Sequence, residues 1–400
     1  MLFGISLEFY FFVIILLFVA LFHKHVLITA LTGFTVVSFY KILFSGFKYG
    51  EGYSGFLSHL SHEWVIVINL LLLLVGFALL SDHFEKSHIT EKISAKLPNG
   101  TLGAFILLLI VFILSAFLDN IAGAIIGATI AVKLFKKKVH LGYLAAIVAA
   151  SNAGGAGSVV GDTTTTMMWL AGVSPLDVLH AFIGSIAAFI LFAFFASRIQ
   201  NTYQPLIRTN SHHKVDMVRI GIVFFILISA ITTNVYVNIN LKHLADFFPF
   251  LGAAVWVSLI LATPLKKPDW SLVPGAFKSS VFLLALVLTA SMMPVDKLPE
   301  ASPISTFGLG FLSSVFDNIP LTALAIKQDN YDWGVLAYAV GYGGSMVWFG
   351  SSSGVAVANI FPEVKSVGKW ITQGWFVIAA YIVGYIAIIL IWGWHPLPID

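Results

Sequence analysis

Two short segments of this 400-residue chain repeat each other inside apolar sequence, and each carries a carboxylate. The repeated segments are Phe117-Leu118-Asp119-Asn120-Ile121 and Val315-Phe316-Asp317-Asn318-Ile319. A second match follows each copy, with the closing glycine seven residues after the first: Gly154-Gly155 then Gly161-Asp162, and Gly343-Gly344 then Gly350-Ser351. A carboxylate in hydrocarbon costs several kcal/mol unless it faces an enclosed polar cavity. Carboxylates at matched positions of a doubled membrane chain therefore indicate an ion site between two repeats.

The composition places the chain in a membrane. Hydrophobic residues make up 58% of it, charged residues only 10%, and the mean hydropathy is +0.94, whereas soluble domains carry about a quarter charged residues. The net charge of +3 is too small to indicate a nucleic-acid partner, and the absence of cysteine excludes disulfides and thiolate metal sites. No phosphate-binding loop, dinucleotide fingerprint or nucleophile–base motif occurs, so we expect neither an enzyme nor a cofactor.

The apolar runs predict an all-α polytopic membrane protein with two matching halves. The first half, 1–200, contains a hairpin at 101–138 and a broken helix at 140–174. The second half, 217–400, contains a hairpin at 302–330 and a broken helix at 333–361, and the polar stretch 201–216 is a cytoplasmic linker. The arms of the second hairpin are too short for two full crossings, so we interpret both hairpins as re-entrant. Each half then has five spans, an odd number, and the halves form inverted repeats.

The placement of basic residues sets the orientation. If the base of the first hairpin is cytoplasmic, 17 of the 22 Lys and Arg residues lie inside, and five lie outside: Lys41, Lys48, Lys242, Lys297 and Lys327. Cytoplasmic loops of membrane proteins carry such an excess of positive charge. The sequence therefore predicts that both termini lie outside.

The two carboxylate segments are candidate ion-binding elements. Asp119-Asn120 and Asp317-Asn318 fall at the predicted hairpin tips, where unpaired backbone groups need protein or water around them. The alternative interpretation is that these Asp and Asn residues only cap helices. Two copies in register favour the ion site.

The broken helices supply further candidate ligands. Glycines at 154 and 155 interrupt the first helix, and hydroxyl, carboxylate and amide groups surround the break, as hard cations such as sodium prefer. The candidates are Asn152, Gly154, Gly155, Asp162, Thr163 and Thr164 in the first half, and Ser345, Ser351 and Ser352 in the second. The alternative is a glycine-rich packing seam in which the threonines bond to their own helix. Because Ser351 stands where Asp162 would recur, the expected carboxylates of a transported sodium ion are Asp119, Asp162 and Asp317.

Other polar residues carry weaker predictions. Glu8, Lys41 and Glu63 lie at the ends of the predicted spans 5–22, 26–46 and 63–81, so we expect their charged ends to reach water. His212 and His213 lie in the linker, where solvated loop is the simplest interpretation and a pH sensor is the alternative.

At these residues the chain resembles the ion transporter superfamily, and most of all its NhaD-type sodium/proton antiporters. The segments that carry the resemblance are Leu118-Asp119-Asn120, Ser151-Asn152-Ala153-Gly154-Gly155-Ala156, Gly161-Asp162-Thr163-Thr164-Thr165-Thr166-Met167-Met168-Trp169 and Phe316-Asp317-Asn318-Ile319-Pro320. The resemblance implies inverted repeats whose hairpins and unwound helices meet at the ion site. It also implies exchange of sodium, with lithium as a second cation, for protons, and a homodimer in a bacterial inner membrane.

The chemistry of three carboxylates independently favours cation exchange, because each can hold a proton or help to hold sodium. Competition for one site is sufficient for antiport, provided that the empty charged site does not reorient easily. The alternatives are a sodium-coupled carboxylate symporter, whose anionic substrate would meet Asp119 and Asp317, and a proton-coupled exporter of arsenite.

Overall fold

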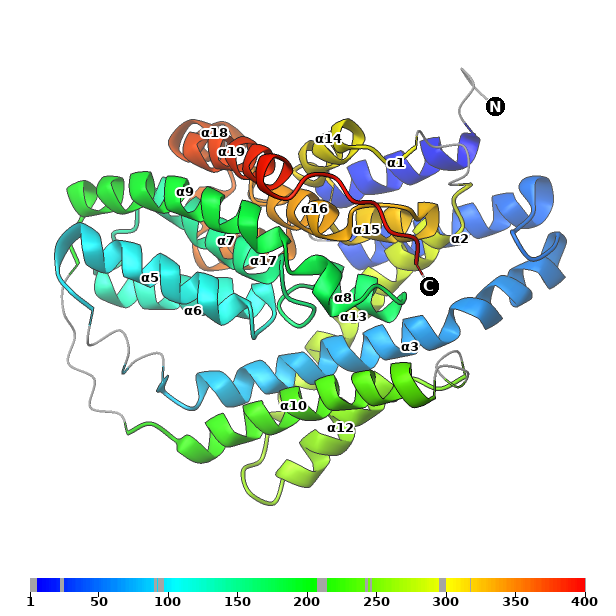
Figure 1. Cartoon of the computed structure of the whole chain (residues 1–400), viewed down its shortest axis with the longest axis horizontal. Coiled ribbons are helices and arrows are strands. Elements are labelled where there is room, and N and C mark those ends of the chain that lie inside the picture. Colours follow the sequence, from blue (N-terminus) through cyan, green and yellow to red (C-terminus); the bar gives the residue numbers. More distant parts are fainter. Residues whose placement is uncertain are drawn as a thin grey trace. The chain divides into compact units, whose positions relative to one another are not determined.

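The regular structure of the described part of the chain is helical (Figure 1). The chain divides into two compact units. The computed structural model describes residues 6–21, 25–89, 92, 97–206, 214–241, 244, 247–294, 300–316 and 318–399. The first unit combines 1–87 with 215–298, and the second combines 88–214 with 299–400. Each unit therefore takes one segment from each predicted half, and the inversion of the halves stays a prediction.

Long apolar helices make the chain a polytopic membrane protein. Within the described ranges, four helical stretches are long and apolar enough to cross a bilayer: Val26–Ser45, Gly52–Glu85, Pro175–Tyr203 and Trp270–Ser291. A fifth candidate is the pair α18 (Val367–Gln373) and α19 (Trp375–Ile391), which bends by 64° at the break between them. Six shorter apolar helices add to these, as expected for a chain whose spans are interrupted.

The first unit is built around one long helix. Its elements are α1 (Leu7–Leu21), α2 (Val26–Tyr40) with its π-helical continuation η1 (Lys41–Ser45), α3 (Gly52–Glu85), α10 (Met217–Asn240), α12 (Phe250–Ala262), η3 (Trp270–Leu272) and α13 (Val273–Ser291). Helix α3 contacts α10, α12 and α13, while α2 contacts α1 and α13. The predicted span 63–81 is thus too short, because α3 begins at Gly52 and ends at Glu85.

Small residues let α3 and α12 pack closely. A Cβ atom on Gly76 would lie 2.5 Å from Val255, and one on Gly252 would lie 2.6 Å from Leu72. The side chain of Asn69 accepts a 2.9 Å hydrogen bond from the backbone N–H of Gly252, one of the donors that the start of α12 leaves without a helical partner. The crossing thus combines close packing with a buried polar contact, as helix pairs in membranes commonly do.

The first unit buries the three charged residues that we expected to reach water. Glu8, Lys41 and Glu63 are only 5%, 6% and 4% exposed, so that expectation is wrong. The longer α3 explains Glu63, which lies inside the helix rather than at its start. Ser45, in the π-helical turn that continues α2, donates a hydrogen bond to Glu8, and the Lys41 ammonium lies 5.4 Å from the centre of the Phe47 ring.

Ion pairs hold the N-terminal end of α10. Asp216 caps this helix by accepting from the N–H groups of Val218 and Arg219. Lys266 Nζ lies 2.9 Å from Asp216 Oδ2, and this hydrogen bond lowers the pKa of the Asp216 carboxyl below its usual value. The Asp216 carboxyl is therefore ionised at neutral pH.

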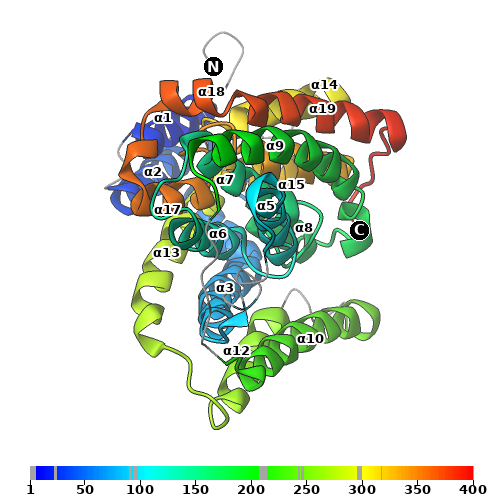
Figure 2. The ribbon, with the colours of Figure 1, turned by 90° about the vertical axis from the view of Figure 1, so that its left-hand side faces the viewer.

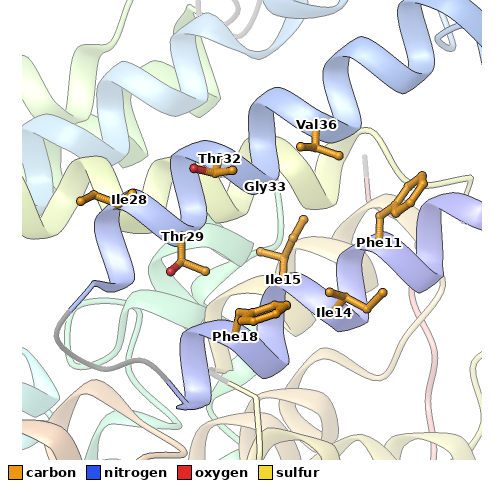
Figure 3. Close-up of a pocket in the computed structure, with 9 residues that line it drawn as sticks. All are labelled: Phe11, Ile14, Ile15, Phe18, Ile28, Thr29, Thr32, Gly33 and Val36. Atoms are coloured by element: carbon orange, nitrogen blue, oxygen red, sulfur yellow. The ribbon is translucent and has the colours of Figure 1, made fainter.

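A cavity of about 360 Å³ between α1 and α2 is too apolar to bind an ion (Figure 3). A Cβ atom on Gly33 would lie 2.6 Å from the Ile15 side chain, so the two helices approach closely at this point. The lining contains no charged side chain: Phe11, Ile14, Ile15, Phe18, Ile28, Thr29, Thr32, Gly33 and Val36. The candidate ion-binding residues lie instead in the second unit.

The second unit contains both predicted hairpins and both predicted broken helices. Its first segment forms α5 (Gly100–Ser115), α6 (Asn120–Leu134), α7 (Leu141–Gly155), α8 (Thr163–Leu170), η2 (Pro175–Val178) and α9 (Ala181–Tyr203). Its second segment forms α14 (Pro303–Ser313), α15 (Asn318–Gln328), α16 (Trp333–Ala337), the π-helix η5 (Tyr338–Tyr342), α17 (Ser352–Ile360), η6 (Pro362–Val364), α18 and α19. The helices end close to the interruptions that the sequence predicts.

Helix α7 forms the centre of the second unit, and all of its residues are buried. It contacts α5, α6 and α9, and α9 in turn runs beside α19 (Figures 1 and 2). At the crossing of α9 and α19, a Cβ on Gly184 would lie 2.9 Å from the Gly384 carbonyl, and one on Gly384 would lie 2.5 Å from the Gly184 carbonyl. The last helices of the two predicted halves therefore meet glycine to glycine.

Candidate functional site

The two broken helices of the second unit have matching breaks. The first separates α7 from α8 at 156–162, and the second separates η5 from α17 at 343–351. A Cβ on Gly155 would lie 2.6 Å from the Gly161 carbonyl, and one on Gly344 would lie 2.6 Å from the Gly350 carbonyl. Each break thus folds back on its own glycine pair, and any side chain there would meet backbone.

Each break also packs against the end of a hairpin helix. A Cβ on Gly161 would lie 2.1 Å from the carbonyl of Ser115 at the end of α5, and one on Gly350 would lie 2.6 Å from the carbonyl of Ser314 after α14. These close approaches bring the loops between α5 and α6 and between α14 and α15 to the breaks.

Asp162 is the carboxylate at the end of the first break, directly before α8. It is 1% exposed and caps α8, where its Oδ1 lies 3.4 Å from the Thr164 backbone N. The Thr164 hydroxyl donates a 2.7 Å hydrogen bond to Oδ2, and the Asn120 amide donates a 3.0 Å hydrogen bond to Oδ1. Asp162 is therefore the cap of α8, and this cap is buried and also joined to the first hairpin through Asn120. These contacts all donate to Asp162, as an ionised carboxylate requires.

The first hairpin tip lies beside this carboxylate. Asp119 occupies the N-cap position of α6, is half-buried and is near enough to Asp162 for the two carboxyl groups to interact electrostatically. Asn120 is buried, and its backbone carbonyl accepts a hydrogen bond from Ser151 of α7. Asp119, Asn120 and Asp162, which were predicted to share a site, are thus brought together.

The second hairpin tip is described only in part. Asp317 lies outside the described residues. Asn318 begins α15 and is 3% exposed. The prediction that Asp317 faces the same site stays a prediction.

Asn152 joins the first broken helix to the second. Its amide Nδ2 donates to Ser345 Oγ at 2.9 Å and to Ser351 Oγ at 3.0 Å. Ser353 Oγ donates to Asn152 Oδ1 at 2.7 Å and lies 2.9 Å from Ser351 Oγ. All four side chains are fully buried, and we call them the Asn152 cluster.

The threonines after Asp162 divide into two groups. Thr163 is 9% exposed and Thr164 is fully buried. The Thr164 hydroxyl donates a hydrogen bond to the Asp162 carboxylate. The hydroxyls of Thr165 and Thr166 instead donate to the carbonyls of Ser158 and Val159 in the break. Both hydroxyls also donate to the backbone carbonyl of Asp162. For Thr165 and Thr166 the structural interpretation therefore holds, since they bond to the backbone and not to the Asp162 carboxylate.

Three stretches that carry site residues, 105–132, 151–169 and 338–358, contain no Lys, Arg or His. A buried carboxylate requires a compensating charge or a proton. No side chain of these three stretches supplies a positive charge.

A second buried carboxylate in this unit has a structural role. Asp332 caps α16 through the Val335 N–H, accepts from the His395 N–H, and lies 2.5 Å from His180 Nε2. These contacts tie α16 to the start of α9 and to the chain end.

Sequence reasoning missed two features of the site. Ser353 was not among the predicted ligands, although its place two residues after Ser351 in a serine run is a usable signal. The matched glycine spacing relates the two breaks, but it gave no signal that Asn152 would pair with serines nearly 200 residues away. Ser352, a predicted ligand, is half-buried at the first position of α17.

Comparison with known proteins gives one family and several relatives. The profile of the family described as "CitMHS: Citrate transporter" matches residues 10–343. "Sodium/proton antiporter 1" of Arabidopsis thaliana is 25% identical over 82% of this chain and 63% of its own length, so the chain spans less than two thirds of that relative. "Na(+)/H(+) antiporter NhaD" of Vibrio cholerae is 27% identical over 72% of this chain and 70% of the relative. The protein of the same name from Vibrio parahaemolyticus is 25% identical over 62% of this chain and 70% of the relative.

Proposed function

The chain belongs to the CitMHS citrate transporter family, and from that premise we propose that it is a secondary transporter that exchanges sodium for protons. The names of the relatives in Arabidopsis and Vibrio support this cargo rather than citrate. The observation that carries the proposal is Asp162, a buried carboxylate that accepts hydrogen bonds at a helix break. Lithium is a second expected cation.

The proposed mechanism is competition at one site. Sodium binds the ionised Asp162 with help from Asp119 and neutral oxygens nearby, and protons bind the same carboxyl groups when sodium leaves. Asp119 and Asp162 are near enough to interact electrostatically, so a proton or cation bound by one carboxyl group affects binding at the other. The site then changes the side of the membrane to which it is open when it holds either sodium or protons. The empty, charged site reorients slowly, because a bare carboxylate is costly in hydrocarbon.

The family description makes citrate symport the second candidate. An anionic substrate at the first hairpin tip would meet the carboxylates of Asp119 and Asp162, and repulsion between like charges would oppose its binding. A site for a carboxylate would be better served by neutral donors. Sodium/proton exchange therefore fits these residues better, and arsenite export has no residue that specifically favours it.

A reconstituted transport assay tests the function. Purified full-length protein in liposomes with a trapped pH dye receives sodium, lithium, potassium, citrate or arsenite under an imposed pH gradient. We expect sodium and lithium to move protons, and potassium, citrate and arsenite to give the signal of protein-free liposomes. Sodium-dependent citrate uptake without sodium/proton exchange would overturn the proposal in favour of symport.

We also propose that 1–200 and 217–400 are inverted repeats in a bacterial inner membrane, with both termini outside and two chains in a homodimer. The matching contacts of Gly155 with Gly161 and of Gly344 with Gly350 support a repeat. The excess of Lys and Arg on one side supports the orientation.

Cysteine labelling tests the inversion, because the chain has no cysteine of its own. Lys137→Cys follows α6 and Asp329→Cys follows α15, so the two variants report the bases of the two hairpins. We expect a membrane-impermeant maleimide to label them from opposite sides of oriented vesicles. If both variants are labelled from the same side, the two halves are not inverted repeats. The proposed cation site does not depend on this result.

A further inference from the structure

Three consecutive lysines follow the first hairpin, and we call them the lysine turn. Lys136, Lys137 and Lys138 come directly after α6, and all three side chains are exposed. Among the described residues, none of the three forms an ion pair. The acidic residues nearest in the sequence, Asp119 and Asp162, lie at the other end of α6, about 22 Å away for a 15-residue helix. The positive charge of the lysine turn is therefore not neutralised locally.

The backbone of the lysine turn has a defined and uncommon conformation. The Lys137 N–H donates a 2.8 Å hydrogen bond to the Val132 carbonyl, and Lys136 has a φ of +48°. This is the Schellman ending of a helix, in which the second of these positions is usually glycine. Lys137 also has a positive φ, +62°. Left-handed conformations of residues other than glycine are uncommon, and such strain occurs preferentially at functional positions.

Buried contacts fix the lysine turn on both sides. The side chain of Gln200 on α9 is fully buried, and its Nε2 donates to the Lys138 carbonyl at 3.1 Å. Its Oε1 accepts a 2.7 Å hydrogen bond from the His140 N–H. Phe135, directly before the turn, is fully buried, and its ring centre lies 5.3 Å from that of Tyr143. The three lysines therefore extend from a backbone that the interior of the second unit holds in place.

The residues around the lysine turn are typical of a membrane–water interface. Tyr203 and Trp375 are 57% and 49% exposed, and the ring centre of Tyr203 lies 5.4 Å from that of His140. The Arg198 guanidinium, near the end of α9, lies 4.2 Å from the centre of the exposed Phe194 ring. Tyrosine and tryptophan are enriched where a bilayer meets water, and arginine stems cover apolar surface while the charged ends reach the headgroups. The lysine turn thus lies at the level of the lipid headgroups.

We infer that the lysine turn binds the headgroup of an anionic phospholipid of the surrounding bilayer. Lysine ammonium groups bind phosphate as point charges, and basic clusters beside membrane helices recognise anionic lipids. A zwitterionic headgroup has no net charge and gains less from the three lysines. A soluble phosphate compound would gain nothing from the exposed aromatic residues, whereas a lipid also contacts them with its acyl chains. The inference does not depend on which ion the chain transports.

The first test compares three ligands. Purified full-length protein in a neutral detergent is titrated with phosphatidylglycerol, with phosphatidylcholine of the same acyl chains, and with glycerol phosphate, and bound molecules are counted by native mass spectrometry. We expect phosphatidylglycerol to bind at least about tenfold more tightly than either of the others. Equal affinity for the two lipids would overturn the inference, and so would glycerol phosphate that binds as tightly as phosphatidylglycerol.

The second test removes the charge of the lysine turn. Replacing all three of its lysines by glutamine should weaken phosphatidylglycerol binding at least about tenfold, because each basic residue near an anionic lipid contributes on the order of fivefold. The matched control is Lys48→Gln/Lys267→Gln/Lys278→Gln, which removes three charges from exposed positions of the first unit and should bind the lipid as wild type does. Wild-type affinity in the lysine-turn variant would overturn the inference. An equal loss in both variants would also overturn it, because attraction by the total charge would then explain the binding.

Discussion

Asp162→Asn is expected to reduce sodium-driven proton movement to the background of protein-free liposomes. The Asp162 carboxylate is 1% exposed and accepts from the Asn120 amide and the Thr164 hydroxyl. Asparagine removes the negative charge and places an NH₂ group where one of these two neighbours already donates. Removing one partner of a buried ion pair costs about 3–5 kcal/mol, so sodium binding should weaken by roughly a hundredfold or more. The asparagine amide also cannot bind and release a proton at this position, so any sodium that still binds there would not be exchanged for protons.

Two further variants separate charge from folding. Asp177→Asn makes the same substitution in η2 of the same unit, at a half-buried residue outside the site, and should leave exchange unchanged. Asp162→Glu keeps the charge and should retain weak sodium-dependent proton movement. Size-exclusion profiles and melting temperatures in detergent check that each variant folds. Wild-type exchange by Asp162→Asn would show that the site is assigned to the wrong residues.

The sequence predicted the parts of the site but not how they combine. Glycines at 154, 155 and 161 and the polar residues beside them interrupt an apolar run, and the structure ends α7 at Gly155 and starts α8 at Thr163. Such breaks are local, because a helix interior disfavours glycine whatever surrounds it. The contact of Asn152 with Ser345 joins residues that are 193 positions apart, and it depends on the packing of two breaks that hydropathy does not relate.

The errors in the first unit have a common cause. The predicted span 63–81 omitted the first turns of α3, because polar residues such as His59 and His62 lower the hydropathy of that stretch. The predicted span 26–46 agrees with the helical stretch Val26–Ser45, but Lys41 near its end is buried in the structure instead of reaching water. A polar residue in an apolar chain therefore marks either a helix end or a buried polar contact. Only the packing distinguishes the two, as it does for Glu8 and Ser45.

The apparent Km for sodium is expected to rise as the pH falls from about 8 to about 6, where perturbed carboxyl groups commonly titrate. If sodium and protons compete for Asp119 and Asp162, saturating sodium should restore most of the maximal rate until proton release limits turnover. The steepness with which Km changes with pH also gives the number of protons that compete with one sodium ion. Mass action gives a Km that rises about tenfold per pH unit when one proton competes, and about a hundredfold when two are displaced together. Initial rates in proteoliposomes at several sodium concentrations and pH values measure the slope.

A separate pH sensor would give a different pattern. Protonation of His212 or His213, which lie outside the described residues, would lower the maximal rate with little change in the Km for sodium. The double variant His212→Ala/His213→Ala should therefore keep the rise of Km at low pH, because the competing groups remain in the buried site. If that variant instead loses all pH dependence, the protons act at the linker, and competition between sodium and protons at Asp162 is the wrong mechanism for this chain.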